Sequence, residues 1–479
     1  MSEQTAPQLP AWRRYLAYAT VALMPLSANI EKYIKQEKAQ PDYKGPLDLL
    51  LPLLAILFVG DLLMNRDRVR FKFPPVPMVL WTLLAAASCF AIDKFPGDGT
   101  LMPALKAVAN VALFGLAGVW VFQNAGNGPG DYRRMALILG ASFSVCLLIA
   151  IKQYFGPVGI PFDPENPAKD LGGATNMRVA GWYDFRAAFG SQVALLVPAA
   201  AAFALCDESK IVRWLAGVFV VAALCVTLAA GGFIGACAGV IAVACAFGLS
   251  GRWMTALLAI AILLGVASIV LPRLPRKNPD VLLRNVSLFA EDSKGRKRPT
   301  PRLRRYQAAV DLYGAPRDAH IEGSPEIWLR GVGIGKYQGQ INRFYDSEAY
   351  PKPGMATDDE IAFDMDADER FTFGFLETSA VEMGIGGIFV LALIFGVWIF
   401  AGHAAFARMG GAADPISTLG LAAFGAGVGA LVLSAFASPM IPGVKGSLAF
   451  FMALALCADA WSKDAAQFLY ARRIKRDDE

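Results

Sequence analysis

The chain has 479 residues, of which 55% are hydrophobic and 18% are charged, and its mean hydropathy is +0.44. Soluble domains carry about 25% charged residues, so this composition excludes an ordinary soluble enzyme, a disordered protein and a nucleic-acid-binding protein. The 45 basic and 40 acidic residues are too evenly balanced to indicate a polyanionic partner. Since the apolar residues gather in long runs, we predict an all-α membrane protein that crosses the bilayer many times.

A membrane-spanning helix needs about 20 mostly apolar residues, and on this criterion the sequence predicts about twelve of them. In chain order they lie near residues 15–30, 46–64, 76–92, 103–122, 135–151, 186–206, 215–231, 232–249, 254–272, 379–400, 416–436 and 443–461. The first run follows Arg13 and Arg14, and we interpret it as an uncleaved span rather than a signal peptide. The seventh and eighth spans form one run, in which we expect a tight turn around 229–232.

Ionisable and thiol groups inside these runs are few. The seven cysteines all lie in apolar runs, so no disulfide and no cysteine metal site is expected. Asp48, Asp61, Lys106 and Asp459 lie within or at the ends of spans, where an unpaired charge is costly, and we expect them to pair with other residues of the chain.

Lysine and arginine follow the even-numbered spans, for example at Arg66–Lys72, Arg133–Arg134 and Lys210–Arg213. Short cytoplasmic loops are enriched in these residues, so we predict that both termini lie in the cytoplasm. The loop at 31–45 has four lysines on the opposite side, but three acidic residues partly offset them.

This topology divides the chain into three parts. Residues 1–272 form a membrane domain of nine spans with an outer loop at 152–185, residues 273–378 form a large periplasmic loop domain, and residues 379–479 contain the last three spans and a cytoplasmic tail. We detect no repeat that relates the two halves of the chain, which argues against an inverted-repeat transporter.

The large loop is strongly polarised in charge. Residues 273–305 contain eleven basic and three acidic residues, whereas residues 346–369 contain nine acidic residues and one lysine. One interpretation is two solvated surfaces that pair with each other. The other is an anion site beside a carboxylate-rich cleft, because arginine binds a diphosphate through two parallel hydrogen bonds.

Four sequence blocks, in order, resemble those of the bacterial O-antigen ligases and of the O-antigen or exopolysaccharide polymerases. The blocks are Arg178-Val-Ala-Gly-Trp-Tyr183, Leu228-Ala-Ala-Gly-Gly-Phe-Ile-Gly235, Arg302-x3-Tyr306-x-Ala-Ala309 with Gly331-Val-Gly-Ile-Gly335, and Phe375-Leu-Glu377-x5-Met383-Gly-Ile-Gly-Gly387. The second block lacks an arginine that the family usually has at the corresponding turn. The blocks cover about residues 170–390, and the family has about twelve membrane helices, as predicted here.

The resemblance implies a glycosyltransferase that uses an undecaprenyl-diphosphate-linked glycan as its donor at the periplasmic face, without a metal or another cofactor. A polymerase transfers the glycan to another lipid-linked repeat unit, whereas a ligase transfers it to lipid A-core. Ligases carry a histidine near the end of the large loop, and Phe373 stands at the corresponding position here. His320, the only histidine of the large loop, lies more than fifty residues upstream, so this departure favours a polymerase.

Guanidinium groups near the donor diphosphate stabilise the charge that develops on its oxygens. We expect Arg178 and Arg302 to have this role, with Arg186 and Arg305 in support, although Arg178 and Arg186 could instead anchor the chain at the membrane surface. The general base of the acceptor hydroxyl is predicted among carboxylates near the start of the tenth span. These candidates are Glu377, Glu382 and Glu369. Besides the ligase, a non-enzymatic alternative is a flippase or transporter of lipid-linked glycans.

Overall fold

The computed structural model describes the helical bundle and a few short segments around it. The described residues are 11–26, 46–64, 83–88, 118, 120–121, 124, 128–155, 181, 183, 186–227, 229–249, 289–291, 297–299, 331, 333, 375–410, 413–435 and 445–477. The predicted spans at 76–92, 103–122 and 254–272 therefore lie mostly or wholly outside the described residues, as does most of the loop at 273–378.

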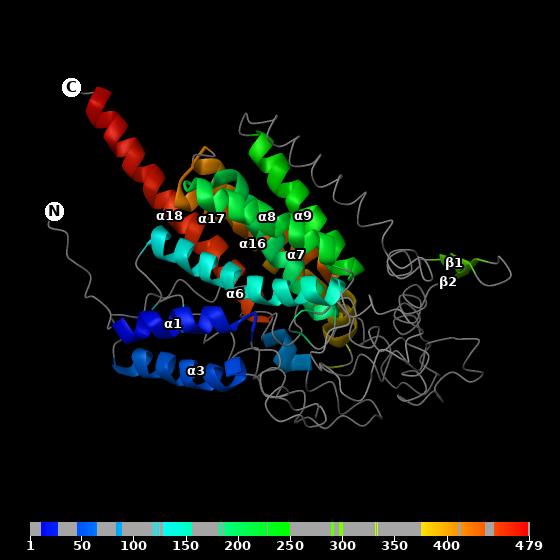
Figure 1. Cartoon of the computed structure of the whole chain (residues 1–479). Coiled ribbons are helices and arrows are strands. Elements are labelled where there is room, and N and C mark those ends of the chain that lie inside the picture. The colour runs from blue at the N-terminus through cyan, green and yellow to red at the C-terminus, as the bar shows by residue number, and fades with distance from the viewer. Residues whose placement is uncertain are drawn as a thin grey trace.

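The described part of the chain is helical apart from one small ribbon (Figure 1). The helices are α1 (Ala11–Leu23), α3 (Pro46–Met64), α6 (Pro129–Phe155), α7 (Arg186–Cys206), α8 (Lys210–Val226), α9 (Ala230–Leu249), α16 (Phe375–Arg408), α17 (Pro415–Ser434) and α18 (Lys445–Asp477). Five of them contain stretches that are long and apolar enough to cross a membrane. These stretches are Pro129–Gln153, Ala188–Cys206, Gly231–Leu249, Phe375–Arg408 and Pro415–Ser434. The fold is that of an α-helical membrane protein.

A two-stranded antiparallel ribbon interrupts the large loop, which the prediction of an all-α fold did not include. Strand β1 (Phe289–Glu291) pairs with β2 (Lys297–Pro299), and Ala290 lies opposite Arg298. Lys297 and Arg298, two of the basic residues in the charged stretch at 273–305, belong to β2.

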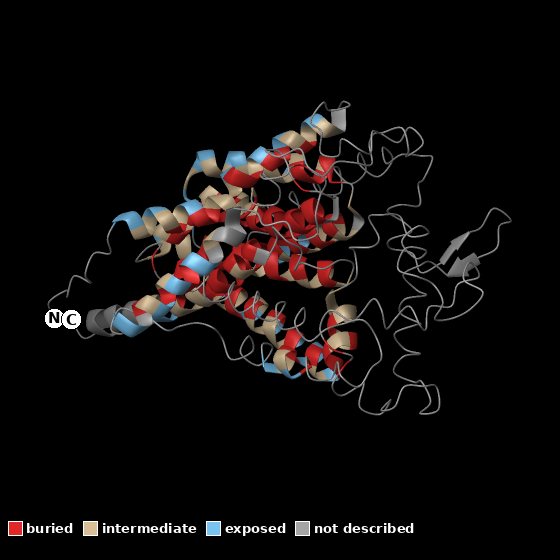
Figure 2. Ribbon diagram, turned by 90° about the horizontal axis from the view of Figure 1, so that it is seen from below, coloured by how far each residue is buried: buried red, intermediate tan, exposed pale blue. Residues whose placement is uncertain are grey.

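The bundle core consists of α7, α9, α16, α17 and α18, and buried residues concentrate there (Figure 2). Small residues let these helices approach closely, as is common where lipid supplies no hydrophobic driving force between helices. A Cβ atom built on Gly232 of α9 would lie 2.4 Å from the Cα atom of Gly190 on α7. A Cβ atom built on Gly429 of α17 would lie 2.1 Å from the carbonyl oxygen of Ala194 on α7. Side chains larger than hydrogen are therefore excluded at these two positions.

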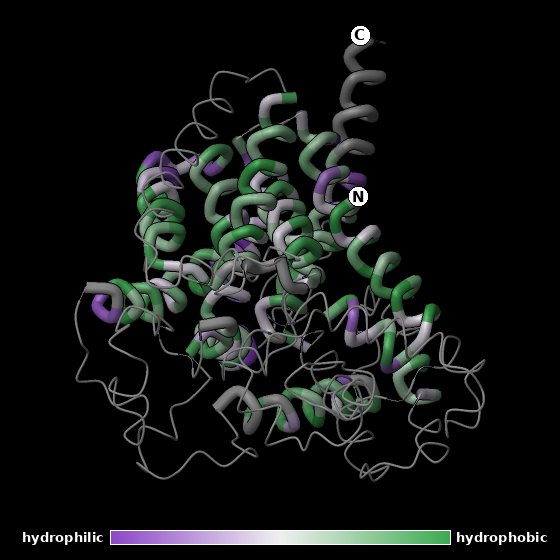
Figure 3. Tube along the Cα trace, turned by 90° about the vertical axis from the view of Figure 1, so that its right-hand side faces the viewer, coloured by the Kyte–Doolittle hydropathy of each residue, from purple (hydrophilic) through white to green (hydrophobic). Residues whose placement is uncertain are grey.

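The outer surfaces of the bundle are apolar as well, which Figure 3 shows as hydrophobic segments along the outer helices. On α8, for instance, Ile211, Trp214 and Val218 are exposed, with Trp214 78% accessible. In a soluble protein such a surface would favour aggregation, whereas lipid chains are its natural surroundings in a membrane.

The turn between α8 and α9 lies slightly earlier in the chain than predicted. Helix α8 ends at Val226, Thr227 is its C-terminal cap, and α9 begins at Ala230. Gly231 and Gly232 therefore belong to the first turn of α9 and not to the connection. Gly232 is one of the residues at which α9 contacts α7, together with Gly235 and Gly239.

Ion pairs between helices gather at one end of the bundle, which we call the charged end. Arg13 of α1 pairs with Asp61 of α3 at 2.7 Å, and Arg13 also donates to Asn124. At the same end Arg408 of α16 pairs with Asp459 of α18. The prediction of internal pairing is thus confirmed for Asp61 and Asp459, whereas Lys106 and the side chain of Asp48 lie outside the described residues.

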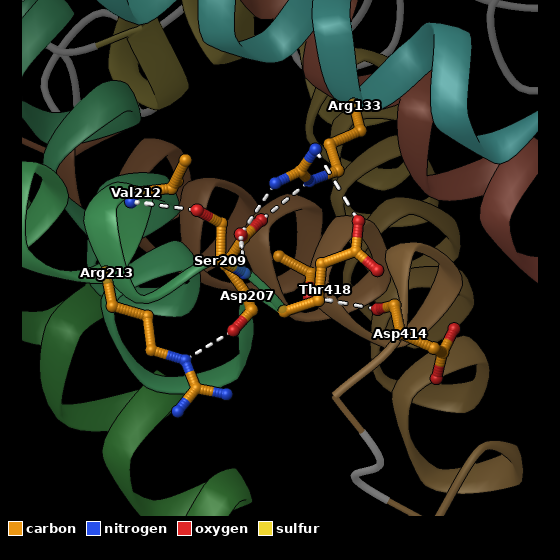
Figure 4. A network of polar contacts seen from close by, with 8 residues as sticks. Arg133, Asp207, Ser209, Val212, Arg213, Asp414 and Thr418 are labelled. Atoms are coloured by element: carbon orange, nitrogen blue, oxygen red, sulfur yellow. Dashed lines mark hydrogen bonds and ion pairs between the residues drawn. The ribbon is translucent and has the colours of Figure 1, made fainter.

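A third ion pair joins α6 to the turn between α7 and α8 (Figure 4). The Arg133 guanidinium donates two hydrogen bonds, of 2.7 and 2.8 Å, to the Asp207 carboxylate, whose side chain is only 1% exposed. Ser209 N–H also donates to this carboxylate, and the Arg213 side chain donates to the Asp207 carbonyl oxygen. Nearby, the Asp414 carboxylate caps the N-terminus of α17, and burial raises its pKa.

The opposite end, which we call the loop end, carries the starts of α7 and α16 and the described loop residues Gly181, Tyr183, Gly331 and Gly333. Helix α6 ends there, and α7, α9 and α16 begin there. Helix α17 packs antiparallel to α7, α9 and α16 through small residues along its length. Helix α1 begins and α18 ends on the side of the charged end (Figure 1). Helices α7, α9 and α16 therefore run parallel to one another and antiparallel to α17.

Candidate active site at the loop end of the bundle

Helix α16 begins at the loop end and is kinked near its start. Gly384 has φ 66° and ψ −164°, a backbone conformation that residues other than glycine rarely adopt. This non-helical residue divides α16 into a short N-terminal piece, which contains Glu377 and Glu382, and a long apolar piece. Kinks of this kind interrupt the regular hydrogen-bond pattern of a helix, so the backbone beside Gly384 becomes available to other segments.

Two glycines of the large loop occupy that position. The Gly333 N–H donates a 3.0 Å hydrogen bond to the carbonyl oxygen of Glu382. A Cβ atom built on Gly331 would lie 2.2 Å from the same oxygen, and Gly331 has a positive φ of 73°. Both glycines are buried. The contact joins parts of the chain about fifty residues apart, and it depends on glycine both for the backbone conformation and for the close approach.

The earlier loop is attached to the bundle in a similar way. Gly181 lies in the left-handed conformation with φ 61°, and a Cβ atom there would lie 2.9 Å from the carbonyl oxygen of Cys146 on α6. Gln153, in the last turn of α6, binds Gly181 with both ends of its side-chain amide. Tyr183, two residues further, is 1% exposed, and burial raises its pKa well above 10. The segment before α7 is therefore held against α6 and α7.

The structure describes three of the seven residues predicted for the active site. Glu377 and Glu382 are half-buried residues of the N-terminal piece of α16. They are five positions apart in the chain, which corresponds to about 140° around a helix, so they point to different sides. Arg186 is the first residue of α7, as predicted, and its backbone is described. Arg178, Arg302, Arg305 and Glu369 lie outside the described residues, as do His320 and Phe373.

The described ranges contain no group of three or more histidine, cysteine or acidic side chains that could hold a metal ion. What they do contain at the loop end is a carboxylate-bearing helix start, a loop segment bound to it, and a second loop segment bound to α6. A carboxylate can accept a proton from a hydroxyl group that lies within hydrogen-bond reach.

Two features of this site did not emerge from the sequence. The kink at Gly384 was hidden in a run of apolar and small residues that reads as continuous helix, although the glycines at 384, 386 and 387 were a signal. The role of Gln153 had one signal, a polar residue in the last turn of an apolar span, but its partner is 28 residues away. Neither the kink at Gly384 nor the contact of Gln153 follows from the local sequence pattern.

Comparison with known proteins gives no family assignment. No protein-family model matches the chain, and none of the curated proteins compared with it is significantly similar.

Proposed function

We propose that this chain is an inner-membrane glycosyltransferase that polymerises undecaprenyl-diphosphate-linked repeat units of an O-antigen or exopolysaccharide at the periplasmic face. The observation that supports this best is the hydrogen bond from Gly333 to Glu382. It attaches a segment of the large hydrophilic loop to a membrane helix directly beside a carboxylate. A glycan in water and a diphosphate at the lipid headgroups meet at such a boundary.

In the proposed reaction, an acceptor hydroxyl oxygen attacks the anomeric carbon of the donor sugar. A new glycosidic bond forms, the bond from that carbon to the diphosphate oxygen breaks, and undecaprenyl diphosphate leaves with the bonding electron pair. The hydroxyl proton passes to a carboxylate, for which Glu377 and Glu382 are the described candidates and Glu369 is a third. Arg178 and Arg302, supported by Arg186 and Arg305, stabilise the negative charge of the leaving diphosphate.

The ligase alternative differs only in its acceptor, which is lipid A-core, and the flippase alternative forms no bond. Purified protein in lipid nanodiscs, supplied with a synthetic lipid-linked repeat unit, separates the three. A polymerase yields a ladder of products that differ by one repeat unit. Product that appears only when lipid A-core is added identifies a ligase, and the absence of any new glycosidic bond under both conditions contradicts both enzymatic proposals.

The same assay tests the residues. We expect Arg178→Ala and Arg302→Ala each to abolish product, and the corresponding lysine variants to restore part of it, because lysine lacks the two-pronged geometry of arginine. Removal of the general base, by Glu377→Gln or Glu382→Gln, should lower the rate by about 10²–10⁴-fold. Glu208→Gln is the matched control, since Glu208 is a carboxylate at the charged end with a 54% exposed side chain.

A retained rate in both Glu377→Gln and Glu382→Gln would exclude these carboxylates as the base. An additional His320→Ala variant then decides whether the histidine of the large loop has that role, as the ligase alternative requires.

A further inference from the structure

One face of α8 is apolar and exposed over a length that matches one leaflet of a membrane. Ile211, Trp214, Leu215 and Val218 are all exposed, and they recur at the spacing of a single helix face. From Ile211 to Val221, the last exposed large side chain of α8, the helix rises about 15 Å at 1.5 Å per residue. The hydrocarbon core of a bilayer is about 30 Å thick, so this face has about the length of the lipid chains in one leaflet.

Two basic residues lie at the start of this face, at the charged end of the bundle. Lys210 is exposed and Arg213 is half-buried. They are three positions apart on the helix, where Cβ atoms are about 5–6 Å from each other, so both side chains reach one phosphate group. Arg213 Nε donates to the Asp207 carbonyl oxygen, and the two terminal nitrogens of the guanidinium point away from the Arg133–Asp207 pair (Figure 4).

Neither Lys210 nor Arg213 forms an ion pair with another residue of the described ranges. Other basic side chains of the charged end do form such pairs with aspartates. These are Arg13, Arg133, Arg134, Arg408 and Lys463. Glu208, two residues before Lys210, lies 3.6 Å from Arg133. The described part of the chain therefore leaves two positive charges without an acidic partner beside an apolar helix face.

We propose that this face binds an anionic phospholipid, with its phosphate between Lys210 and Arg213 and one acyl chain along Trp214 and Val218. The charge of the two basic residues is complementary to an anionic headgroup, whereas a zwitterionic headgroup also brings an ammonium group that they repel. An exposed tryptophan beside them is typical of the headgroup level of a membrane. The proposal is independent of the proposed function, because the candidate active site lies at the loop end.

A second copy of the chain is a less suitable occupant of this face. Two copies in one membrane have the same orientation, and a twofold dimer through α8 places the same surface of each copy against the other. Lys210 and Arg213 of both copies would then lie at the same depth and repel each other. A lipid phosphate removes this repulsion.

The test measures which lipid lies against Trp214. The full chain is reconstituted in phosphatidylcholine that is brominated on its acyl chains, because bromine quenches tryptophan fluorescence at short range. The chain has nine tryptophans, so the contribution of Trp214 is obtained as the difference between each protein and the same protein with Trp214→Phe. Unbrominated phosphatidylglycerol is then added, and the fraction that relieves half of the quenching of Trp214 gives its affinity relative to phosphatidylcholine.

A basic residue near a membrane surface favours anionic lipid about fivefold. We therefore expect the wild type to prefer phosphatidylglycerol about 25-fold and Lys210→Gln with Arg213→Gln to show no preference. The matched control is Arg134→Gln with Lys463→Gln, which removes two exposed cations of the same end that already have acidic partners. This control should retain the preference of the wild type.

Lys210→Gln alone keeps the bond from Arg213 to Asp207 and should retain about a fivefold preference. It tests the site even if the double variant does not fold. Equal affinity of the wild type for the two lipids overturns the proposal, as does an equal loss of preference in the two double variants. If brominated lipid does not quench Trp214 at all, a protein surface covers this face, and the lipid site is excluded.

Discussion

At the scale of single residues, Gly331 is one of the two glycines that bring the large loop against α16. Gly331 and Gly410 both have a positive φ, of 73° and 62° respectively. Their surroundings differ, because a Cβ atom on Gly331 would meet the backbone of Glu382 at 2.2 Å, whereas one on Gly410 meets nothing within 4 Å. Alanine variants at the two positions therefore separate the free-energy cost of a positive φ from the free-energy cost of a clash.

We predict that Gly331→Ala lowers product formation at least about tenfold, because the clash displaces the loop from the kink and a misplacement of about 1 Å can cost about 100-fold in rate. Gly410→Ala should lose only the conformational preference of glycine, about 1 kcal/mol of stability, and keep its activity. Product formation and thermal unfolding of the two variants in detergent measure this. Equal activity in the two variants would mean that the loop contact does not support the reaction.

The Arg133–Asp207 pair is a second case in which one side chain matters. Removal of one partner from a buried ion pair leaves an uncompensated charge and costs about 3–5 kcal/mol. Arg133→Ala should therefore strongly destabilise the protein, because Asp207 is almost fully buried. Replacement of both partners, as Arg133→Met with Asp207→Leu, should recover much of the loss.

The matched control for this prediction is Arg134→Ala. Arg134 is the next residue on α6, but its side chain is 68% exposed and pairs with Asp131 one turn away. Exposed pairs contribute about 0–1 kcal/mol, so the melting temperature should hardly change. A similar loss of stability in both variants would show that α6 tolerates neither change and that the ion pair is not the cause.

At the scale of helices, the bundle depends on close approach between backbones. Gly232 of α9 lies against Gly190 of α7, while Gly217 of α8 has open space around it. Gly232→Ala forces two backbones apart, and we expect it to cost at least about 1–3 kcal/mol, the range for overpacked cores. Gly217→Ala should be neutral or stabilising, because alanine favours helix by about 1 kcal/mol over glycine.

Thermal unfolding of the two alanine variants in the same detergent checks this difference. A stable Gly232→Ala variant would mean that α7 and α9 adjust by sliding, and the turn at 227–229 would be the place to find that adjustment, because it connects α8 to α9.

At the scale of the whole molecule, the bundle has two chemically different ends. Ion pairs between helices mark the charged end, and the contacts of Gly181 and Gly331 with the bundle mark the loop end. If the positive-inside preference governs the orientation, the charged end faces the cytoplasm. A cysteine at position 320 in the large loop should then react with an impermeant maleimide in intact spheroplasts.

A cysteine at Ala413, an exposed residue of the connection between α16 and α17 at the charged end, serves as the opposite control. It should react only after lysis. The reverse pattern would place the large loop in the cytoplasm, where the proposed periplasmic reaction does not occur, and would contradict the function as well as the topology.

Local pattern in the sequence was sufficient to predict several of the described helices. The runs at 46–64 and 186–206 coincide with α3 and α7, because about twenty consecutive apolar residues have few alternatives to a helix in lipid. The internal pairing of Asp61 and Asp459 was also predictable, since an isolated charge in a membrane span is costly. The predicted span at 379–400, by contrast, lies inside a longer helix, Phe375–Arg408, whose kink was not predicted.

Only the tertiary structure decided which distant residues meet. The approach of Gly331 to the kink at Gly384, and the contact of Gln153 with Gly181, each join parts of the chain that are 28 or more residues apart. Sequence periodicity describes which side of a helix is apolar, but it contains no information on which loop returns to which helix end. That choice depends on backbone groups and on the space that glycine leaves, and both become defined only when the helices have packed.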